Sequence, residues 1–290
     1  MKLPDFEYEV PATVAEATGL LAHYQDEANV LAGGQSLIPL LALRLAHPAV
    51  IVDINGLDEL SGISVNDGRV TVGAMTREYM AEESGTVAVT VPLLAAALPL
   101  IGHEAIRSRG TLGGSLAHAD PAAELPAVAR ALDAEFVVRS ESGERVIPAA
   151  GWFEGYLTTS RRADEILVEV RFPAAEAGTG VAFQEVARRH GDFAMVGLAA
   201  SLTLTDGTIT DARLAFSGVA DVPVRADAAE SVLVGHEPSA ELFAEAAFQA
   251  AEPLDPPADL HGSSDYRKKV AAALVRRGLQ AAADNAYERQ

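Results

Sequence analysis

The sequence predicts an α+β protein of two domains, and three observations support this fold class. The chain has 290 residues, which at roughly 150 residues per domain favours two domains or slightly more. Short strand-like runs and helical segments are mixed through residues 1–175, whereas the remainder predicts a β-meander followed by helices. Between them, residues 174–180 are small and turn-rich, so we place the domain boundary there, with domains over 1–175 and 176–290.

The first part of the chain is expected to contain one helix and then a strand–loop–helix–strand unit. Thr13 and Glu16 form a capping box ahead of apolar residues at helical spacing, which predicts a helix over 13–24. Further on, strands are expected over 29–32 and 49–54, with a helix over 37–45 between them.

Hairpins and short helices are expected next. Asp67-Gly68 lies between two strand-like runs, which predicts a hairpin over 63–72, and a second hairpin is expected over 136–147. Other expected elements are helices over 76–83, 122–132 and part of 91–106, and a strand over 165–172. In the C-terminal domain we expect strands over 194–204 and 208–217 and helices over 239–252 and 265–283.

The composition excludes several classes of protein. With 49% hydrophobic and 22% charged residues the chain is a folded globular protein. Its formal net charge of −19 argues against nucleic acid and against an anionic membrane surface as partners. The absence of cysteine excludes disulfides, thiolate nucleophiles and iron–sulfur ligation by cysteine in this chain.

The chain is expected to be soluble and cytoplasmic, without membrane insertion. No apolar signal segment is visible in the opening residues. The most apolar stretch, residues 87–101, is short for a membrane span and contains Pro92 and Pro99, so a buried helix or loop is the better interpretation.

Most familiar catalytic signatures are missing. The chain has no G-x-G-x-x-G, no phosphate-binding G-x-x-x-x-G-K-[ST], no G-x-S-x-G and no H-E-x-x-H. His118 and Asp120 form a tight His/Asp pair, and one pair cannot complete a metal coordination shell. We therefore expect neither catalytic residues nor metal ligands in this chain.

Two glycine-rich turns are the strongest functional signal. Residues 32–36, Ala-Gly-Gly-Gln-Ser, lie between a strand and a helix, and residues 111–115, Thr-Leu-Gly-Gly-Ser, precede a helix. Glycine accepts positive φ and lets a ligand approach the backbone, so successive amide groups can converge on an anion. An ordinary tight turn is the alternative for either motif alone. Together, with hydroxyls at Ser36, Thr111 and Ser115, they favour a dinucleotide whose diphosphate is held without lysine.

The motifs and their surroundings resemble the FAD-binding medium subunit of molybdenum hydroxylases. This is the xanthine dehydrogenase family, and the aerobic carbon monoxide dehydrogenase type is closest in layout. Residues 32–39 and 106–126 carry the similarity, and the second segment is the more specific. It continues through 164–173 and 191–194 to 259–267, and therefore covers essentially the whole chain.

The resemblance implies a fold and a set of FAD contacts. The fold is a two-part FAD-binding domain of the PCMH or vanillyl-alcohol-oxidase type, with subdomains 1–56 and 57–175, followed by a smaller C-terminal α/β domain with an antiparallel sheet and helices. The first glycine loop would wrap the diphosphate, and the second would approach it and the flavin from the other side. The implied cofactor-binding residues are Leu31, Ala32, Gly33, Gly34, Gln35, Ser36, Leu37, Ile38, Thr111, Leu112, Gly113, Gly114, Ser115, Asp120, Glu124, Leu167, Gln184 and Phe193.

Individual residues in this set have implied roles and alternatives. The resemblance makes Glu124 an acidic FAD contact, Leu167 a contact to the ring system and Asp120 a residue that orients its loop. From the residues alone, Glu124 also fits an exposed first turn of a helix, where it complements the helix dipole. Leu167 and Phe193 equally fit plain core packing, and packing is the expected role of Trp152.

Three positions depart from the pattern of the family. Ser115 stands where asparagine is common, and Phe193 where a tyrosine is frequent beside the flavin ring. Gln184 stands where some relatives have a lysine, which removes a positive charge that would stabilise reduced, anionic flavin.

The resemblance implies an electron-transfer subunit of a heterotrimeric molybdenum hydroxylase. A small subunit with two [2Fe–2S] clusters and a large subunit with a molybdenum–pterin cofactor would be its partners, as a dimer of heterotrimers. Electrons would leave the FAD for NAD, a quinone or oxygen. A stand-alone FAD oxidoreductase of the same fold and a non-redox nucleotide-binding module stay open as alternatives.

Positive charge is concentrated in the C-terminal helix of this acidic chain. Apolar residues at helical spacing accompany it, so we interpret the segment as a solvated face over a core stripe, with a docking surface for a partner subunit as the alternative. The basic residues are Arg267, Lys268, Lys269, Arg276 and Arg277.

Overall fold

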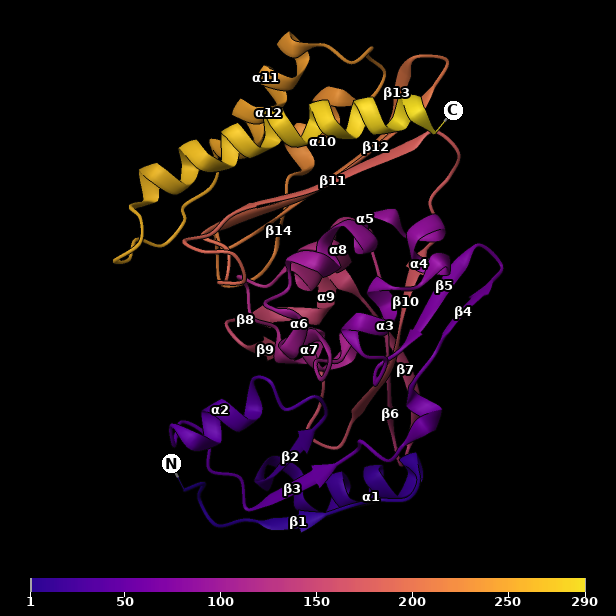
Figure 1. Ribbon diagram of the computed structural model, residues 1–290, viewed down its shortest axis with the longest axis vertical. Coiled ribbons are helices and arrows are strands. Elements are labelled where there is room, and N and C mark those ends of the chain that lie inside the picture. Colours follow the sequence, from indigo (N-terminus) through magenta and orange to yellow (C-terminus); the bar gives the residue numbers. More distant parts are fainter. Residues whose placement is uncertain (1, 290) are drawn as a thin grey trace.

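The computed structural model describes residues 2–289 and has three parts stacked along its long axis (Figure 1). The N-terminal part holds a small parallel sheet in the order β1-β3-β2. Its elements are β1 (Glu7–Glu9), α1 (Val14–Tyr24), β2 (Ala28–Leu31), α2 (Leu37–Ala42) and β3 (Val50–Asp53). Thr13 caps α1 by accepting a hydrogen bond from the Glu16 amide at 3.1 Å, which confirms the helix expected there.

The central part is built on a five-stranded antiparallel sheet in the order β4-β5-β10-β6-β7. These strands are β4 (Ile63–Asn66), β5 (Arg69–Gly73), β6 (Glu135–Ser140), β7 (Gly143–Pro148) and β10 (Ile166–Pro173). The β4–β5 turn confirms the predicted hairpin, because Asp67 and Gly68 both adopt positive φ, 49° and 72°.

Short helices cover the central sheet. They are α3 (Glu78–Glu82), α4 (Gly85–Thr90), α5 (Pro92–Ala97), α6 (Glu104–Arg107), α7 (Leu112–His118), α8 (Glu124–Ala131) and α9 (Ala149–Trp152), with a small β8 (Phe153–Gly155) and β9 (Thr158–Thr159) pair. Trp152 is fully buried and stacks on Phe136 with ring centroids 4.4 Å apart, and its Nε1 donates to the Leu116 carbonyl at 3.0 Å. The expected packing role of Trp152 is therefore confirmed.

The C-terminal part has a four-stranded antiparallel sheet between two layers of helices. Its elements are β11 (Thr179–Val186), β12 (Val196–Thr205), β13 (Thr208–Ser217), β14 (Val224–Arg225), α10 (Asp227–Leu233), α11 (Ala240–Ala251) and α12 (Ser264–Glu288). Helix α12 crosses one face of the sheet, and α5 and α8 of the central part lie on the other (Figure 1). Because Phe183, Ala199 and Ala215 join the core of the central part, the two parts share buried apolar surface.

Strand β11 begins inside the turn-rich segment from which we predicted only a boundary. The reason is a glycine: a Cβ atom at Gly180 would lie 2.0 Å from the Ala282 carbonyl oxygen of α12. Only glycine lets α12 approach the sheet this closely, so a residue with low strand propensity sits in a strand. Strand β1, α4, α10 and the β8–β9 pair also lack a clear local signal in the sequence.

The C-terminal helix uses its basic residues in different ways. Arg267 is 5% exposed and donates to the Gly218 carbonyl at 3.0 Å and to Asp259 Oδ2 at 2.8 Å, so it stabilises the fold and is not part of a docking surface. Removing α12 would uncover the core beneath it, so a truncation near residue 262 cannot test docking. Among residues 2–289, no helix is both long and apolar enough to cross a membrane.

Charge reversal at the exposed residues of α12 is expected to have little effect. Arg276 and Arg277 are exposed, and their side chains form no hydrogen bond or ion pair within the described chain. The double variant Arg276→Glu/Arg277→Glu should change the free energy of unfolding by less than about 0.5 kcal/mol per site, because surface substitutions of this kind rarely do more. Thermal unfolding and co-purification of partner subunits check this. Loss of a partner from a normally folded variant would instead favour the docking surface.

Candidate functional site

The two glycine motifs meet at one cavity. The cavity has a volume of about 360 Å³ and lies where the N-terminal and central parts face each other. Loop 32–36 and most residues of the segment 110–118 line it. The implied FAD contacts that line it are Ala32, Gly33, Gly34, Gln35, Ser36, Leu37, Thr111, Gly113, Gly114, Ser115, Asp120, Glu124, Leu167 and Phe193.

The first motif has unpaired amide groups in residues that line the cavity. Gly34 adopts a positive φ of 73°, which turns the chain between β2 and α2. Within residues 2–289, the amide N–H groups of residues 33–36 have no hydrogen-bond acceptor. Asn55 steadies the start of the loop by donating to the Ala32 carbonyl at 2.9 Å. Four successive free amides in a turn are suited to an anion such as a diphosphate.

The second motif differs from the expected loop. Its glycines form the first turn of α7, with Thr111 as N-cap, and neither has a positive φ. The amides are already used: Leu112 donates to Thr76, Gly113 to Ala74, and Gly114 to the Thr111 hydroxyl. The expectation that both motifs offer free amides is therefore wrong for the second motif. Its residues line the cavity, and two of them carry hydroxyl groups.

Close packing explains the other glycines. A Cβ at Gly33 would lie 2.4 Å from the Arg109 carbonyl oxygen and 2.9 Å from Gly110 Cα, so the first loop rests directly on the second motif. A Cβ at Gly113 would lie 2.4 Å from Ala74 Cβ, which places α7 against the end of β5. These glycines are required for contact between segments, whereas Gly34 is required for its φ.

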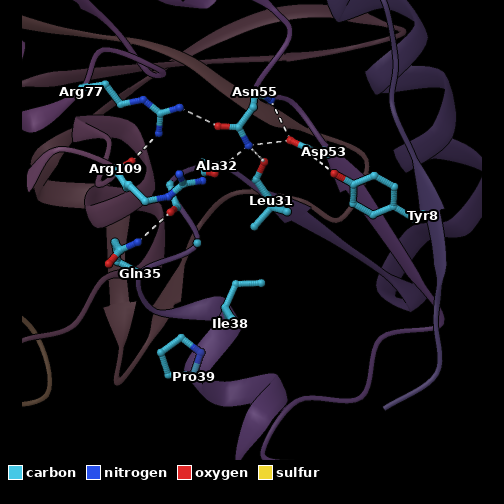
Figure 2. A pocket seen from close by; sticks show the side chains of 12 residues that line it. Tyr8, Leu31, Ala32, Gln35, Ile38, Pro39, Asp53, Asn55, Arg77 and Arg109 are labelled. Atoms are coloured by element: carbon cyan, nitrogen blue, oxygen red, sulfur yellow. Dashed lines mark hydrogen bonds between the residues drawn. The ribbon is translucent and has the colours of Figure 1, made fainter. Parts of the chain in front are cut away.

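A second cavity, of about 680 Å³, lies beside the same loop (Figure 2). Leu31 and Ile38 line this cavity and not the first one. Arg77 donates to Asn55 Oδ1 at 2.7 Å and also to the Arg109 carbonyl, so it ties the loop region to the second motif. These contacts fix the backbone on which the free amides lie.

The Asp53 carboxylate completes the polar chain in Figure 2. It accepts hydrogen bonds from the Tyr8 hydroxyl and from the Asn55 amide, the latter at 2.9 Å. Burial alone would raise the pKa of Asp53, but these hydrogen bonds and Arg77 hold it below its usual value. An ionised Asp53 keeps Asn55 oriented toward the loop.

The first cavity also contains two buried carboxyl groups. Glu124, the first residue of α8, is 4% exposed, so the interpretation as an exposed helix residue is wrong. Burial raises the pKa of Glu124 to about 7. Glu78, the first residue of α3, is 3% exposed, and burial together with Glu124 raises its pKa to about 8.

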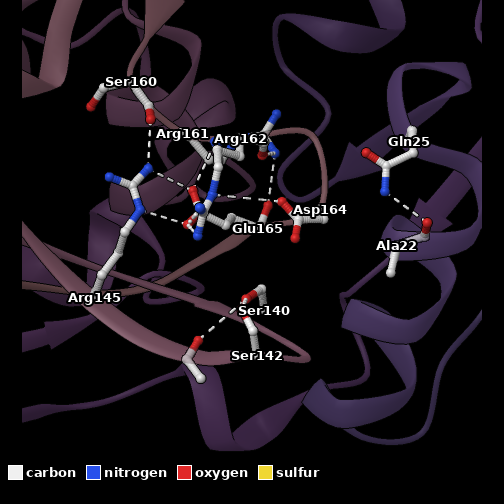
Figure 3. Close-up of polar contacts among 11 residues, drawn as sticks. Ala22, Gln25, Ser140, Ser142, Arg145, Ser160, Arg161, Arg162, Asp164 and Glu165 are labelled. Atoms are coloured by element: carbon white, nitrogen blue, oxygen red, sulfur yellow. Dashed lines mark hydrogen bonds and ion pairs between the residues drawn. The ribbon is translucent and has the colours of Figure 1, made fainter.

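Three arginines surround Glu165 (Figure 3), and Arg161 and Glu165 line the cavity. The Glu165 side chain is 1% exposed and accepts from Arg145 at 2.6 and 2.8 Å and from the Arg162 side chain at 3.0 Å. Arg161 donates to the Glu165 carbonyl at 2.7 Å. Burial would raise the pKa of Glu165, but these hydrogen bonds lower it to about 2.

Several implied contacts have a different or partial role. Leu112 lines neither cavity because its side chain is buried in the central core, and Gln184, on β11, also lies outside both. Phe193 is 59% exposed and lines the cavity, so the core-packing alternative is wrong for it, whereas Leu167 is both buried and lining. Asp120 accepts from the Ala122 amide at 2.9 Å and thereby orders its own turn.

Other lining residues had no signal of their own in the sequence. Glu78, Arg161 and Glu165 are charged residues in unremarkable local patterns, and only tertiary packing brings them to the cavity. The apolar lining residues Ile54, Met75, Ile101 and Ile106 likewise come from separate segments. No three His, Cys, Asp or Glu side chains gather as a metal site would require within residues 2–289.

The cavity between the two glycine motifs is suited to a nucleotide, and comparison with known proteins specifies the family. The family model "FAD binding domain in molybdopterin dehydrogenase" matches residues 4–175, and "CO dehydrogenase flavoprotein C-terminal domain" matches residues 181–282. The chain therefore belongs to the FAD-binding medium subunits of the molybdopterin dehydrogenases. It is the FAD subunit of a molybdenum hydroxylase complex.

Relatives cover the chain almost completely. The alpha subunit of the 6-hydroxypseudooxynicotine dehydrogenase complex of Paenarthrobacter nicotinovorans is 42% identical over 96% of this chain and 95% of its own length. The beta subunit of caffeine dehydrogenase of a Pseudomonas species is 40% identical over 98% and 97%. The solved carbon monoxide dehydrogenase of Hydrogenophaga pseudoflava superposes with a TM-score of 0.96 at 40% identity, covering 98% of this chain and 99% of that one.

The residues of this chain fit FAD. The free amides of residues 33–36 suit the diphosphate, and the hydroxyl-bearing residues Thr111 and Ser115 line the same cavity. Apolar side chains at Ile101, Leu167 and Phe193 provide surface for aromatic rings.

Proposed function

We propose that the chain transfers electrons inside a three-subunit molybdenum hydroxylase. FAD, when bound, supplies the redox chemistry, receiving electrons from the [2Fe–2S] clusters of a small subunit and passing them to an external acceptor such as NAD, a quinone or oxygen. A large subunit with a molybdenum–pterin cofactor oxidises the substrate. A dimer of such heterotrimers is the proposed assembly.

The residues of this chain hold and orient the cofactor. The amides of residues 33–36 bind the diphosphate, and the contact of Gly33 with Arg109 keeps the loop against α7. Asn55 and Arg77 brace that contact from behind. We call the amides of residues 33–36 the diphosphate cradle. Because these contacts order the cradle before FAD binds, they lower the entropic cost of binding.

The observation that carries the proposal is a FAD cradle in a chain with no cysteine. A chain with no cysteine cannot hold an iron–sulfur cluster by thiolates, so the electron donor belongs to another subunit. Among the described residues, no hydroxyl group that lines the cavity donates a hydrogen bond to a histidine or a carboxylate, which suits a subunit that transfers electrons and does not act on the substrate itself.

The substrate is determined elsewhere in the complex. Relatives of nearly equal identity, from 39 to 42%, are named for 6-hydroxypseudooxynicotine, caffeine and carbon monoxide dehydrogenases. The three compounds in these names differ widely in size and polarity, yet the FAD subunits remain alike over nearly their whole length. The medium subunit therefore carries little substrate specificity.

Isolation of the native complex tests the proposal. The chain should co-purify with two further subunits, about one FAD per copy of this chain, molybdenum and acid-labile sulfide. Substrate added to that complex should bleach the flavin absorbance, whereas the isolated chain with FAD should show no bleaching. Substrate-dependent bleaching by the isolated chain would identify a stand-alone oxidoreductase and contradict the proposal.

A further inference from the structure

Glu78 is a buried carboxyl group that no side chain neutralises. It lines the FAD cavity, and its Oε2 is buried with no hydrogen-bond partner among the described residues. Its backbone amide donates to the Gly110 carbonyl at 3.0 Å, which holds the residue against the second glycine motif. An unpaired carboxylate is costly to bury, so the neutral acid is the form that this position favours.

The carboxyl group lies directly behind the diphosphate cradle. A Cβ at Gly110 would be 2.3 Å from Glu78 Oε2, and a Cβ at Gly33 would be 2.9 Å from Gly110 Cα. Gly110 is therefore in close contact with both Glu78 and the first loop. An ionised Glu78 would place a negative charge next to an incoming diphosphate, whereas a neutral Glu78 would offer an O–H donor.

The charged groups around Glu78 leave the neutral form of its carboxyl group favoured. Arg107 lowers the pKa of Glu78, but its guanidinium already donates to Glu82 at 2.7 Å and to the Ile101 carbonyl at 3.1 Å. Glu124, from α8, acts in the opposite direction. Other titratable groups at the cavity are His118, Asp120, Arg161 and Glu165, and Asp120 and Glu185 add negative charge beside Glu124.

We propose that Glu78 is a FAD-positioning residue that must carry its proton when the cofactor binds. The proposal rests on FAD binding at the cavity between the two glycine motifs. Its basis is the burial of the carboxyl group, its unpaired oxygen and its place behind the cradle. By linkage, a bound diphosphate stabilises the protonated acid further, so FAD binding takes up a proton above neutral pH and FAD affinity falls as pH rises.

The test compares FAD affinity of the full chain and of Glu78→Gln at several pH values. Glutamine keeps the shape and an N–H donor but does not ionise. With the pKa of Glu78 near 8, the ratio of the wild-type Kd to the Glu78→Gln Kd should rise about tenfold between pH 7 and pH 9. Flavin fluorescence measures Kd, and the ratio removes the contribution of titrating groups that do not interact with Glu78.

Glu83→Gln is the matched control, because Glu83 follows α3 but is exposed. Its Kd ratio to wild type should stay near one at every pH. Calorimetry at pH 8.5 in two buffers of different ionisation enthalpy should show more proton uptake for the wild type than for Glu78→Gln. Equal proton uptake by the wild type and Glu78→Gln, together with a ratio of their Kd values that does not change with pH, would contradict the role of Glu78 but not the proposed function. A full chain that binds no FAD at any pH would instead contradict the proposed function.

Discussion

A Gly33→Ala variant is expected to lose its FAD while the chain stays folded. The added methyl group would lie 2.4 Å from the Arg109 carbonyl oxygen and 2.9 Å from Gly110 Cα, and both of these are backbone atoms that cannot rotate away. The loop must therefore shift, which disturbs the free amides of residues 33–36. Losing two hydrogen bonds to a charged group, at about 1.5–3 kcal/mol each, lowers affinity about a hundredfold or more.

Flavin absorbance per polypeptide measures this effect, with circular dichroism as the check on folding. Gly56→Ala is the matched control, because a Cβ at Gly56 has no atom within 4 Å and its φ is not positive. That variant should remain yellow. A fully pigmented Gly33→Ala protein would contradict the cradle.

Larger side chains at the other motif glycines provide a second comparison. Gly34→Val is expected to release FAD because valine is strained at a φ of 73°. Gly114→Val should do the same because its Cβ would lie 2.6 Å from the Thr111 hydroxyl that caps α7. Gly113→Val is a poor test, since it would push α7 off the backbone of Ala74 and endanger the fold.

The Glu165→Gln variant is expected to lower stability by about 2 kcal/mol, because the buried carboxylate loses charge-assisted hydrogen bonds from two partly exposed arginines. Arg145 and Arg162 both pair with this carboxylate, whose side chain is only 1% exposed. The melting temperature should fall by about 4–8 °C. FAD content should also fall, because Glu165 lines the cofactor cavity.

The lowered pKa of Glu165 determines how its contribution to stability changes with pH. The folded pKa of Glu165, about 2, lies below its ordinary value of 4.5. Its ionised form therefore contributes stability that is present above pH 4.5 and lost as pH falls toward 2. The difference between wild type and Glu165→Gln in thermal unfolding should shrink over that range.

The exposed pair of Arg139 and Glu144 supplies the control for Glu165. Their side chains are 39% and 45% exposed, so Glu144→Gln should cost less than about 1 kcal/mol. A Glu165→Gln protein as stable as Glu144→Gln at neutral pH would contradict the importance of the buried cluster.

Local signals account for the parts of the fold that could be predicted. Thr13 and Ser239 cap helices α1 and α11 through their own hydroxyls, and Asp67-Gly68 turns a hairpin, all over a few residues. Strand β1 was missed because it pairs with β3, more than forty residues away. Strand β11 was missed because Gly180 is explained only by α12, about a hundred residues further on.

The candidate site divides in the same way. The glycine motifs and the residues beside them indicated FAD because short, specific patterns carry the resemblance. The burial of Glu78, however, depends on Gly110, and the exposure of Phe193 depends on a turn between β11 and β12. Neither residue has neighbours in sequence that would reveal its environment.

By itself, the sequence determined the cofactor class, the absence of thiolate chemistry and most helices and hairpins, since these depend on residue identity and short-range spacing. Only the tertiary structure decided which amides remain free, because amides of the second motif donate hydrogen bonds to the carbonyl groups of Thr76 and Ala74. It also decided which carboxyl groups are buried, because desolvation is a property of the assembled core.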